Sequence, residues 1–122
     1  MKLRIKGNAI RMRLNKTDVS KLAENGSLLE ETKFPGNKFI YALQAVEGAA
    51  KLSATMNNNT LILKVPKAFA LEWPGNDVVG LDTKMQVSAT ETLYLLIEKD
   101  FVCLDETTED QSDNFENPNK TC

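Results

Sequence analysis

Basic side chains occupy alternate positions at the start of the chain, and this spacing is suited to binding an anion. The cations are Lys2, Arg4 and Lys6, followed by Arg11 and Arg13 after a Gly7-Asn8 pair. Lysine and arginine neutralise phosphates, and several of them on one surface give salt-dependent binding to a polyanion. We therefore take these five residues as candidate polyanion-binding residues. The alternative is that they are solvated side chains, because edge strands carry lysine and arginine as protection against aggregation.

A β-hairpin turning at Gly7-Asn8 would present all of these cations on one side. Glycine supplies the positive φ of a type II′ turn, and the alternation has the period of a strand. With a two-residue loop, Lys6 pairs with Ala9, and the face opposite the cations is apolar, formed by Leu3, Ile5, Ile10 and Met12. Like charges across a ladder are destabilising. The cationic side therefore requires a bound anion, exposure to open water, or carboxylates from elsewhere in the chain. If carboxylates neutralise it, we expect them to be Glu98 and Asp100.

Residues typical of catalysis are sparse in this sequence. Histidine, the commonest general base, is absent, there is no Gly-rich phosphate loop, and Cys103 has no base at a readable spacing. Cys103 and Cys122 without histidine make a zinc site uncommon, so we expect reduced thiols. We expect no enzymatic activity, no cofactor and no metal. Phe69 and Trp73 are interpreted as core anchors rather than as a stacking platform.

Composition predicts one domain and divides the chain by charge. The 122 residues are 42% apolar, enough for a single core. We expect a domain over residues 1–104 and an acidic tail over 105–122. No apolar run is long enough to span a bilayer, and the start lacks the apolar region of a signal peptide, so we expect a cytoplasmic protein without a membrane partner. Residues 1–34 hold eight Lys/Arg against four Asp/Glu, whereas residues 100–122 hold one against seven.

Local signals predict a helix and a second hairpin after the first. Asn15 is a candidate N-cap with Asp18 three residues later, and Asn25-Gly26 is typical of a helix end. The segments 27–34 and 39–46 alternate as strands around a Pro35-Gly36-Asn37 turn. The first part of the chain therefore reads strand, strand, helix, strand, strand.

The same order recurs at an offset of 51 residues, which predicts pseudo-repeats over 1–47 and 52–99. The apolar phase matches: Ile10, Met12 and Leu14 meet Leu61, Leu63 and Val65, and after a two-residue slip Tyr41 and Leu43 meet Tyr94 and Leu96. In the second copy Asn57-Asn58-Asn59 forms the turn, Pro66 opens the helix, and Pro74-Gly75-Asn76 ends it. The alternative is that any strand-helix-strand protein aligns this loosely with itself.

The repeat unit resembles the swapped-hairpin domains of the AbrB and MazE type. Those domains show a Gly-Asn-Ser turn, a strand ending in Arg, and Pro-Lys opening the helix. Gly7, Asn8 and Arg13 match in the first copy and Pro66-Lys67 in the second, whereas Ala9 replaces Ser, Asn15 replaces Pro and Asn58 replaces Gly. The resemblance implies an α+β, mostly β fold in which two ββαββ units interleave into one small barrel. The segment 98–104 and the Asn-Pro-Asn tail also resemble a small bacterial family without assigned function.

Three function classes follow from these features. The AbrB/MazE resemblance implies a nucleic-acid-binding regulator or antitoxin-like protein that uses the first hairpin on DNA. The alternatives are a module that binds an acidic protein surface and a barrel that binds a small anion or phosphate. The equivalent positions of the second copy are nearly neutral, namely Ser53, Thr55, Asn57, Ile62 and Lys64. The resemblance also implies that a fused pair can remain a monomeric pseudo-dimer.

The acidic tail has two interpretations. It has no aliphatic residue and too little apolar area to fold alone. Its six carboxylates and the hairpin cations share one chain, so the tail is expected to fold back near the hairpin, with Phe115 as its apolar anchor, and to compete with external anions. The alternative is a solvated tail that aids solubility.

Overall fold

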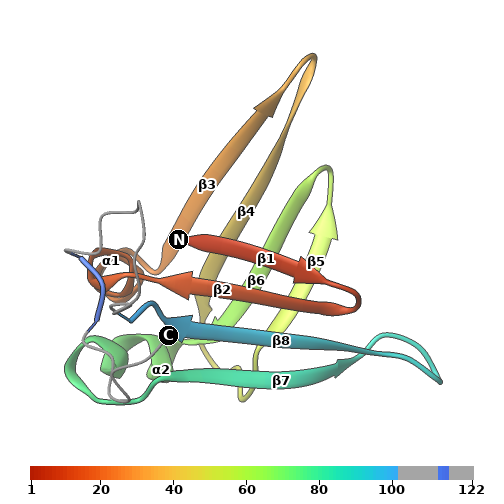
Figure 1. Ribbon diagram of the computed structural model, residues 1–122. Coiled ribbons are helices and arrows are strands. Elements are labelled where there is room, and N and C mark those ends of the chain that lie inside the picture. Colours follow the sequence, from red (N-terminus) through yellow and green to blue (C-terminus); the bar gives the residue numbers. More distant parts are fainter. Residues whose placement is uncertain (102–112, 116–122) are drawn as a thin grey trace.

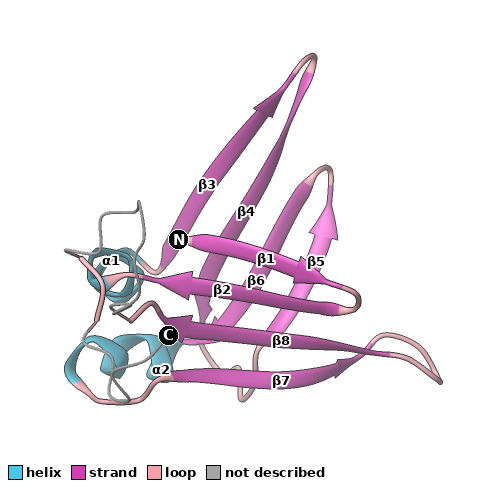
Figure 2. Ribbon diagram, in the orientation of Figure 1, coloured by secondary structure: helices cyan, strands magenta, loops and turns pink. Residues whose placement is uncertain are grey.

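The order strand, strand, helix, strand, strand occurs twice along the chain. The computed structural model describes residues 1–101 and 113–115. Within them the first round is β1 (Lys2–Lys6), β2 (Ala9–Leu14), α1 (Lys16–Asn25), β3 (Ser27–Phe34) and β4 (Asn37–Val46). The second is β5 (Ser53–Asn57), β6 (Thr60–Pro66), α2 (Lys67–Glu72), the 3₁₀ turn η1 (Trp73–Gly75), β7 (Gly80–Gln86) and β8 (Thr92–Lys99) (Figures 1 and 2). The predicted α+β, mostly β class and the two similar units are confirmed.

The strands form two four-stranded sheets, each containing one hairpin from each unit. Sheet A has the order β1-β2-β8-β7 and sheet B the order β3-β4-β6-β5. The central pairs β2–β8 and β4–β6 are parallel, and the hairpins are antiparallel. The two units thus exchange hairpins. The expected closed barrel is wrong, because the described strands form two separate sheets in which β1, β7, β3 and β5 are edge strands.

The core lies where the inner faces of the two sheets meet the helices. Met12, Leu63 and Leu95 are fully buried there. Away from the helices the sheets diverge toward their hairpin turns (Figure 1). For this reason Ile5 is 56% exposed, although it lies on the apolar face as predicted. The apolar face of the hairpin is therefore buried at Ile10 and Met12 but exposed at Ile5.

Local rules account for the first hairpin and α1. Lys6 pairs with Ala9 in the predicted register, and Gly7 has the positive φ (+53°) that the turn requires. Asn15 accepts a hydrogen bond from the Asp18 backbone N–H, and the Asp18 side chain accepts one from Asn15 in return, which completes a capping box. Gly26 ends α1 in the left-handed region, at φ +77°.

The second helix differs slightly from the sequence prediction. Pro66 ends β6 as the N-cap, with ψ 127°, and α2 begins one residue later. Trp73 follows α2 in η1 and is fully buried, with its Nε1 donating to the Val78 carbonyl at 2.7 Å. Its ring centroid lies 5.0 Å from that of Phe69. The interpretation of Trp73 as a core anchor is confirmed.

The strand pairing corrects one part of the repeat alignment. Leu61 of β6 pairs with Tyr41, whereas the equivalent Ile10 of β2 pairs with Leu95. Leu95, not Tyr94, is therefore the counterpart of Tyr41. A shift of one residue moves a strand side chain to the other face. Tyr41 accordingly packs against the core, while Tyr94 lies on the outer face of sheet A.

Candidate polyanion-binding face

The five predicted cations lie together on the outer face of sheet A, opposite the core-facing side chains of the same strands. Lys2 pairs in register with Arg13, and Arg4 with Arg11. We call this surface the cationic face and define it by Lys2, Arg4, Lys6, Arg11 and Arg13. β8 continues it, because Glu98 pairs in register with Arg13.

Two carboxylates near the end of β8 neutralise part of the positive charge of the cationic face. Glu98 Oε1 lies 2.9 Å from Arg13 Nε and 3.6 Å from Arg11 Nε. Asp100 Oδ2 lies 3.0 Å from Lys2 Nζ. These contacts confirm the prediction that Glu98 and Asp100 answer the basic hairpin, and they reduce the repulsion between cations on neighbouring strands.

A cleft opens beside the remaining two cations. Its volume is about 250 Å³, and its lining consists of Arg4, Lys6, Ala9, Ile10, Arg11 and Tyr94. Ala9 stands in register between Lys6 and Tyr94. The small Ala9 side chain leaves space between longer neighbours. Arg4 and Lys6 make no ion pair with any residue in the described ranges, so their charge is available to a ligand.

Tyr94 is the residue of this cleft that sequence reasoning missed. Its hydroxyl donates a hydrogen bond to Asp82 Oδ2 at 2.9 Å, which fixes the direction of the ring. This hydrogen bond, aided by burial and by the Asp82 charge, raises the pKa of Tyr94. Both phases of β8 are apolar around Tyr94, so alternation alone does not reveal which face it takes.

The predicted turn residues attach the hairpin tip to β8. Asn8 Nδ2 donates to the Thr92 carbonyl at 2.7 Å, and the Tyr94 backbone N–H donates to the Asn8 carbonyl at 3.0 Å. The Gly7-Asn8 turn therefore lies flush with sheet A rather than projecting from it. β7 and β8 run on past this turn (Figure 1).

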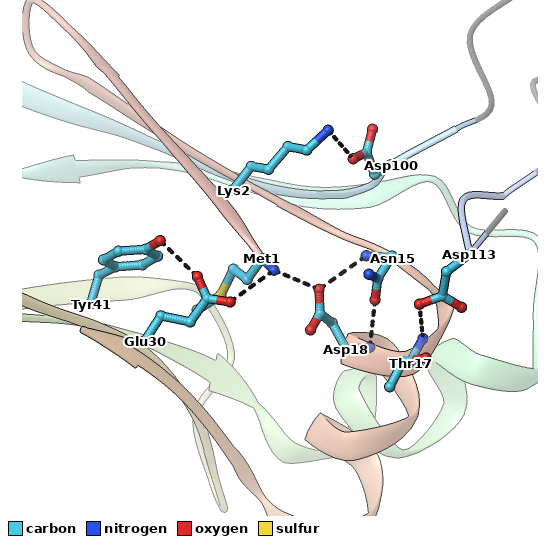
Figure 3. A network of polar contacts seen from close by, with 9 residues as sticks. All are labelled: Met1, Lys2, Asn15, Thr17, Asp18, Glu30, Tyr41, Asp100 and Asp113. Carbon is cyan, nitrogen blue, oxygen red and sulfur yellow. Dashed lines mark hydrogen bonds and ion pairs between the residues drawn. The ribbon is translucent and has the colours of Figure 1, made fainter. Parts of the chain in front are cut away.

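The other end of β1 is held by the ammonium group of Met1, which sequence reasoning also missed. This nitrogen lies 2.8 Å from Asp18 Oδ2 and 3.3 Å from Glu30 Oε1 (Figure 3). Burial lowers the pKa of the ammonium, but the hydrogen bonds and charges of Asp18 and Glu30 outweigh burial and raise it. Glu30 also accepts a hydrogen bond from the Tyr41 hydroxyl at 2.7 Å; burial and this bond raise the pKa of Tyr41 to about 12.

This network predicts alkaline sensitivity. Because the folded pKa of the Met1 ammonium is raised, its stabilisation is complete below the unfolded value of about 8 and is lost as pH rises through the folded pKa. Asp18→Asn should therefore lower the free energy of unfolding at pH 7 and shrink its decrease between pH 7 and 10, measured by urea unfolding. Glu24→Gln, an exposed change on the same helix, is the control. Equal pH dependence in both variants would contradict the role of Asp18.

Residues 113–115 lie at the helix end of the hairpin. Asp113 accepts hydrogen bonds from the backbone N–H groups of Lys16 and Thr17, at 3.0 Å and 3.3 Å, at the start of α1. The Phe115 backbone N–H donates a hydrogen bond to the Asp100 carbonyl at 2.8 Å, and the Phe115 side chain packs against the core. Asp100 and Asp113 are drawn in Figure 3. Phe115 is thus an apolar anchor, as expected. Masking of the cations by the tail stays a prediction; the rest of the tail, with Cys103 and Cys122, lies outside the described residues.

Lys99 is a second charged group that sequence reasoning missed. It is 5% exposed, and its Nζ donates to the Asn76 carbonyl at 2.7 Å. The Phe115 and Trp73 ring centroids lie 4.8 Å and 6.0 Å from this nitrogen. Burial lowers the pKa of Lys99, against the opposing charge of Asp77. The alternation of β8 could have predicted this burial, because Lys99 lies on the same face of the strand as the apolar Leu95 and Ile97.

Comparison with known proteins assigns the chain to a protein family. A model described as "Family of unknown function (DUF7009)" matches residues 1–119. The chain belongs to this family. No curated protein and no solved structure matches the chain. The resemblance to a family without assigned function is thereby confirmed, whereas the resemblance to AbrB and MazE domains is not confirmed.

The outer face of sheet B is the internal counterpart of the cationic face. Its equivalent positions on β5 and β6 carry Ser53, Thr55, Asn57, Ile62 and Lys64. The charge asymmetry between the copies is therefore an asymmetry between two faces of the molecule.

Within the described ranges, no three of the acidic, cysteine or histidine side chains are grouped as metal ligands. None of the helices in those ranges is long and apolar enough to cross a membrane.

Proposed function

We propose that this protein is a non-enzymatic binding protein whose cationic face binds nucleic acid through its phosphates. The observation that carries the proposal is the cleft at Ala9, whose lining includes Arg4, Lys6 and Arg11. A phosphate bound there replaces the missing carboxylates of Arg4 and Lys6 and offsets the repulsion between Arg4 and Arg11, which stand directly across from each other.

The charge balance favours a polyanion. Among the described residues, Glu98 is shared by Arg11 and Arg13 and Asp100 pairs with Lys2, whereas Arg4 and Lys6 make no ion pair. The excess positive charge is distributed along β1 and β2, and such a row attracts a chain of phosphates more strongly than a single anion. The cleft also suits a small phosphate compound, which is the second candidate; a rise in melting temperature with inorganic phosphate alone would favour it.

The exchange of hairpins supports the finer part of the proposal. We propose a fused AbrB/MazE-like pair, acting as a regulator or antitoxin-like protein, in which one unit has kept the cations. Symmetric DNA readers use two half-sites related by a twofold axis. With one cationic face, this protein is expected to bind without recognising palindromic sites.

Glu98→Gln tests the proposal by a gain of affinity. The change removes the charge that neutralises Arg11 and Arg13 but keeps an oxygen for the Arg13 hydrogen bond. We expect the affinity for a labelled oligonucleotide at low salt to rise about threefold to tenfold, up to about 1.4 kcal/mol, with a steeper salt dependence.

Glu31→Gln is the matched control, because Glu31 pairs with Lys38 in sheet B, 3.3 Å away, and its loss changes the net charge equally. Fluorescence polarisation at several salt concentrations measures both variants. An equal gain in both would show that net charge, rather than the cationic face, governs binding.

A further inference from the structure

We propose, resting on the function proposed above, that the cleft at Ala9 accepts an unpaired nucleotide, so that the protein prefers single-stranded over double-stranded nucleic acid. In this mode the Tyr94 ring stacks on a base while Arg4, Lys6 and Arg11 hold phosphates. The cleft is the one place on the described cationic face where an aromatic ring and these three cations line the same hollow.

The attachment of the hairpin disfavours insertion into a duplex groove. A two-stranded ribbon can enter the major groove, which is about 12 Å wide. Here the Asn8 hydrogen bonds hold the turn against β8. A sheet of four strands spaced about 4.8 Å apart is wider than that groove even before side chains are added. Sheet A therefore offers a broad surface, on which an extended single strand can lie.

Tyr94 has the position of a stacking platform. It lies on β8, a central strand of sheet A, and the Asp82 hydrogen bond holds its ring before a ligand arrives. A ring that is already oriented loses little conformational freedom on binding. Asp82 is thus a positioning residue. In a duplex the base faces are covered by their neighbours, so only an unpaired base can use this ring.

Ala9 gives the cleft its depth. A larger side chain at this position would fill the space between Lys6 and Tyr94 without changing any charge. Ala9→Leu therefore separates occupancy of the cleft from general attraction to the cationic face.

The test compares a labelled twenty-residue thymidine oligomer with a duplex of the same length, using the full chain. We expect the wild type to bind the single strand about tenfold more tightly. Tyr94→Leu should lower single-strand affinity about tenfold, within the range for loss of one stacked base, and lower duplex affinity much less. Tyr94→Phe keeps the ring but loses the Asp82 hydrogen bond, so its single-strand affinity should lie between those of the wild type and Tyr94→Leu. Ala9→Leu should reduce single-strand affinity as Tyr94→Leu does.

Folding of each variant is checked by circular dichroism. If Tyr94→Leu does not fold, Ala9→Leu decides the test, because it fills the cleft without changing any charge. Equal affinity for single strand and duplex, with no effect of Tyr94→Leu or Ala9→Leu, overturns this inference but leaves phosphate binding by the cationic face intact. Absence of binding to either probe at low salt overturns the proposed function itself. A uridine oligomer of the same length identifies whether RNA or DNA is preferred as the single strand.

Discussion

Replacing Arg4 and Lys6 together by alanine is expected to lower nucleic-acid affinity at least about tenfold at low salt, equivalent to about 1.4 kcal/mol. Both side chains line the cleft and lack an ion pair among the described residues, so their removal takes away ligand contacts rather than internal ones. The slope of log affinity against log salt should fall by about 0.7 for each lost phosphate contact on a single strand. Polarisation titrations over a range of salt concentrations measure both quantities.

The matched control replaces Lys33 and Lys64 by alanine. These residues lie on the outer face of sheet B, in the phase opposite the core-facing Leu28 and Leu63, and their loss lowers the net charge by the same amount. Affinity should stay near the wild-type value in this variant. A similar loss in both double variants would mean that binding follows net charge and is not located on the cationic face.

Trp73→Ala is expected to lower the free energy of unfolding by about 3–5 kcal/mol. Trp73 is fully buried, with Phe69 and Lys99 beside its ring, and its loss leaves a cavity and an unpaired Val78 carbonyl. Domains of this kind are stable by about 5–15 kcal/mol, so the loss is a large part of the total stability, and at the lower end of this range the variant would be partly unfolded. Urea unfolding is followed by far-ultraviolet circular dichroism rather than by tryptophan fluorescence, because Trp73 is the single tryptophan of the sequence and the variant lacks it.

Leu71→Ala on α2 is the control for this substitution, since Leu71 is 54% exposed and should change stability by less than about 0.5 kcal/mol. A Trp73→Ala variant as stable as the control would contradict the packing role of Trp73.

Short-range rules made the hairpin and α1 predictable from the sequence. A two-residue loop with a glycine determines the register of its strands, which placed all five cations correctly. The Asn15–Asp18 capping box and Gly26 likewise depend on residues a few positions apart. The carboxylates of Glu98 and Asp100 were also predictable, because a row of cations in adjacent strands requires nearby negative charge.

Long-range packing accounts for what the sequence did not reveal. Whether eight strands close into a ring or divide into two sheets depends on how β1, β3, β5 and β7 meet, and no local pattern specifies that. Tyr94 was aligned with Tyr41 because both lie in apolar strands, yet a shift of one residue places them on opposite faces. The cleft depends on the juxtaposition of Ala9 with Tyr94, from strands 85 residues apart in the sequence.

Nuclear magnetic resonance mapping tests most directly whether the cationic face is the binding surface. Amide spectra of the ¹⁵N-labelled protein are recorded during titration with the thymidine oligomer at low salt. We predict that the amides of Lys6, Ala9, Arg11 and Tyr94 shift together and saturate, while those of Lys33, Ile62 and Lys64 stay in place. Shifts concentrated on the outer face of sheet B, or none at saturating oligomer, would contradict nucleic-acid binding by the cationic face.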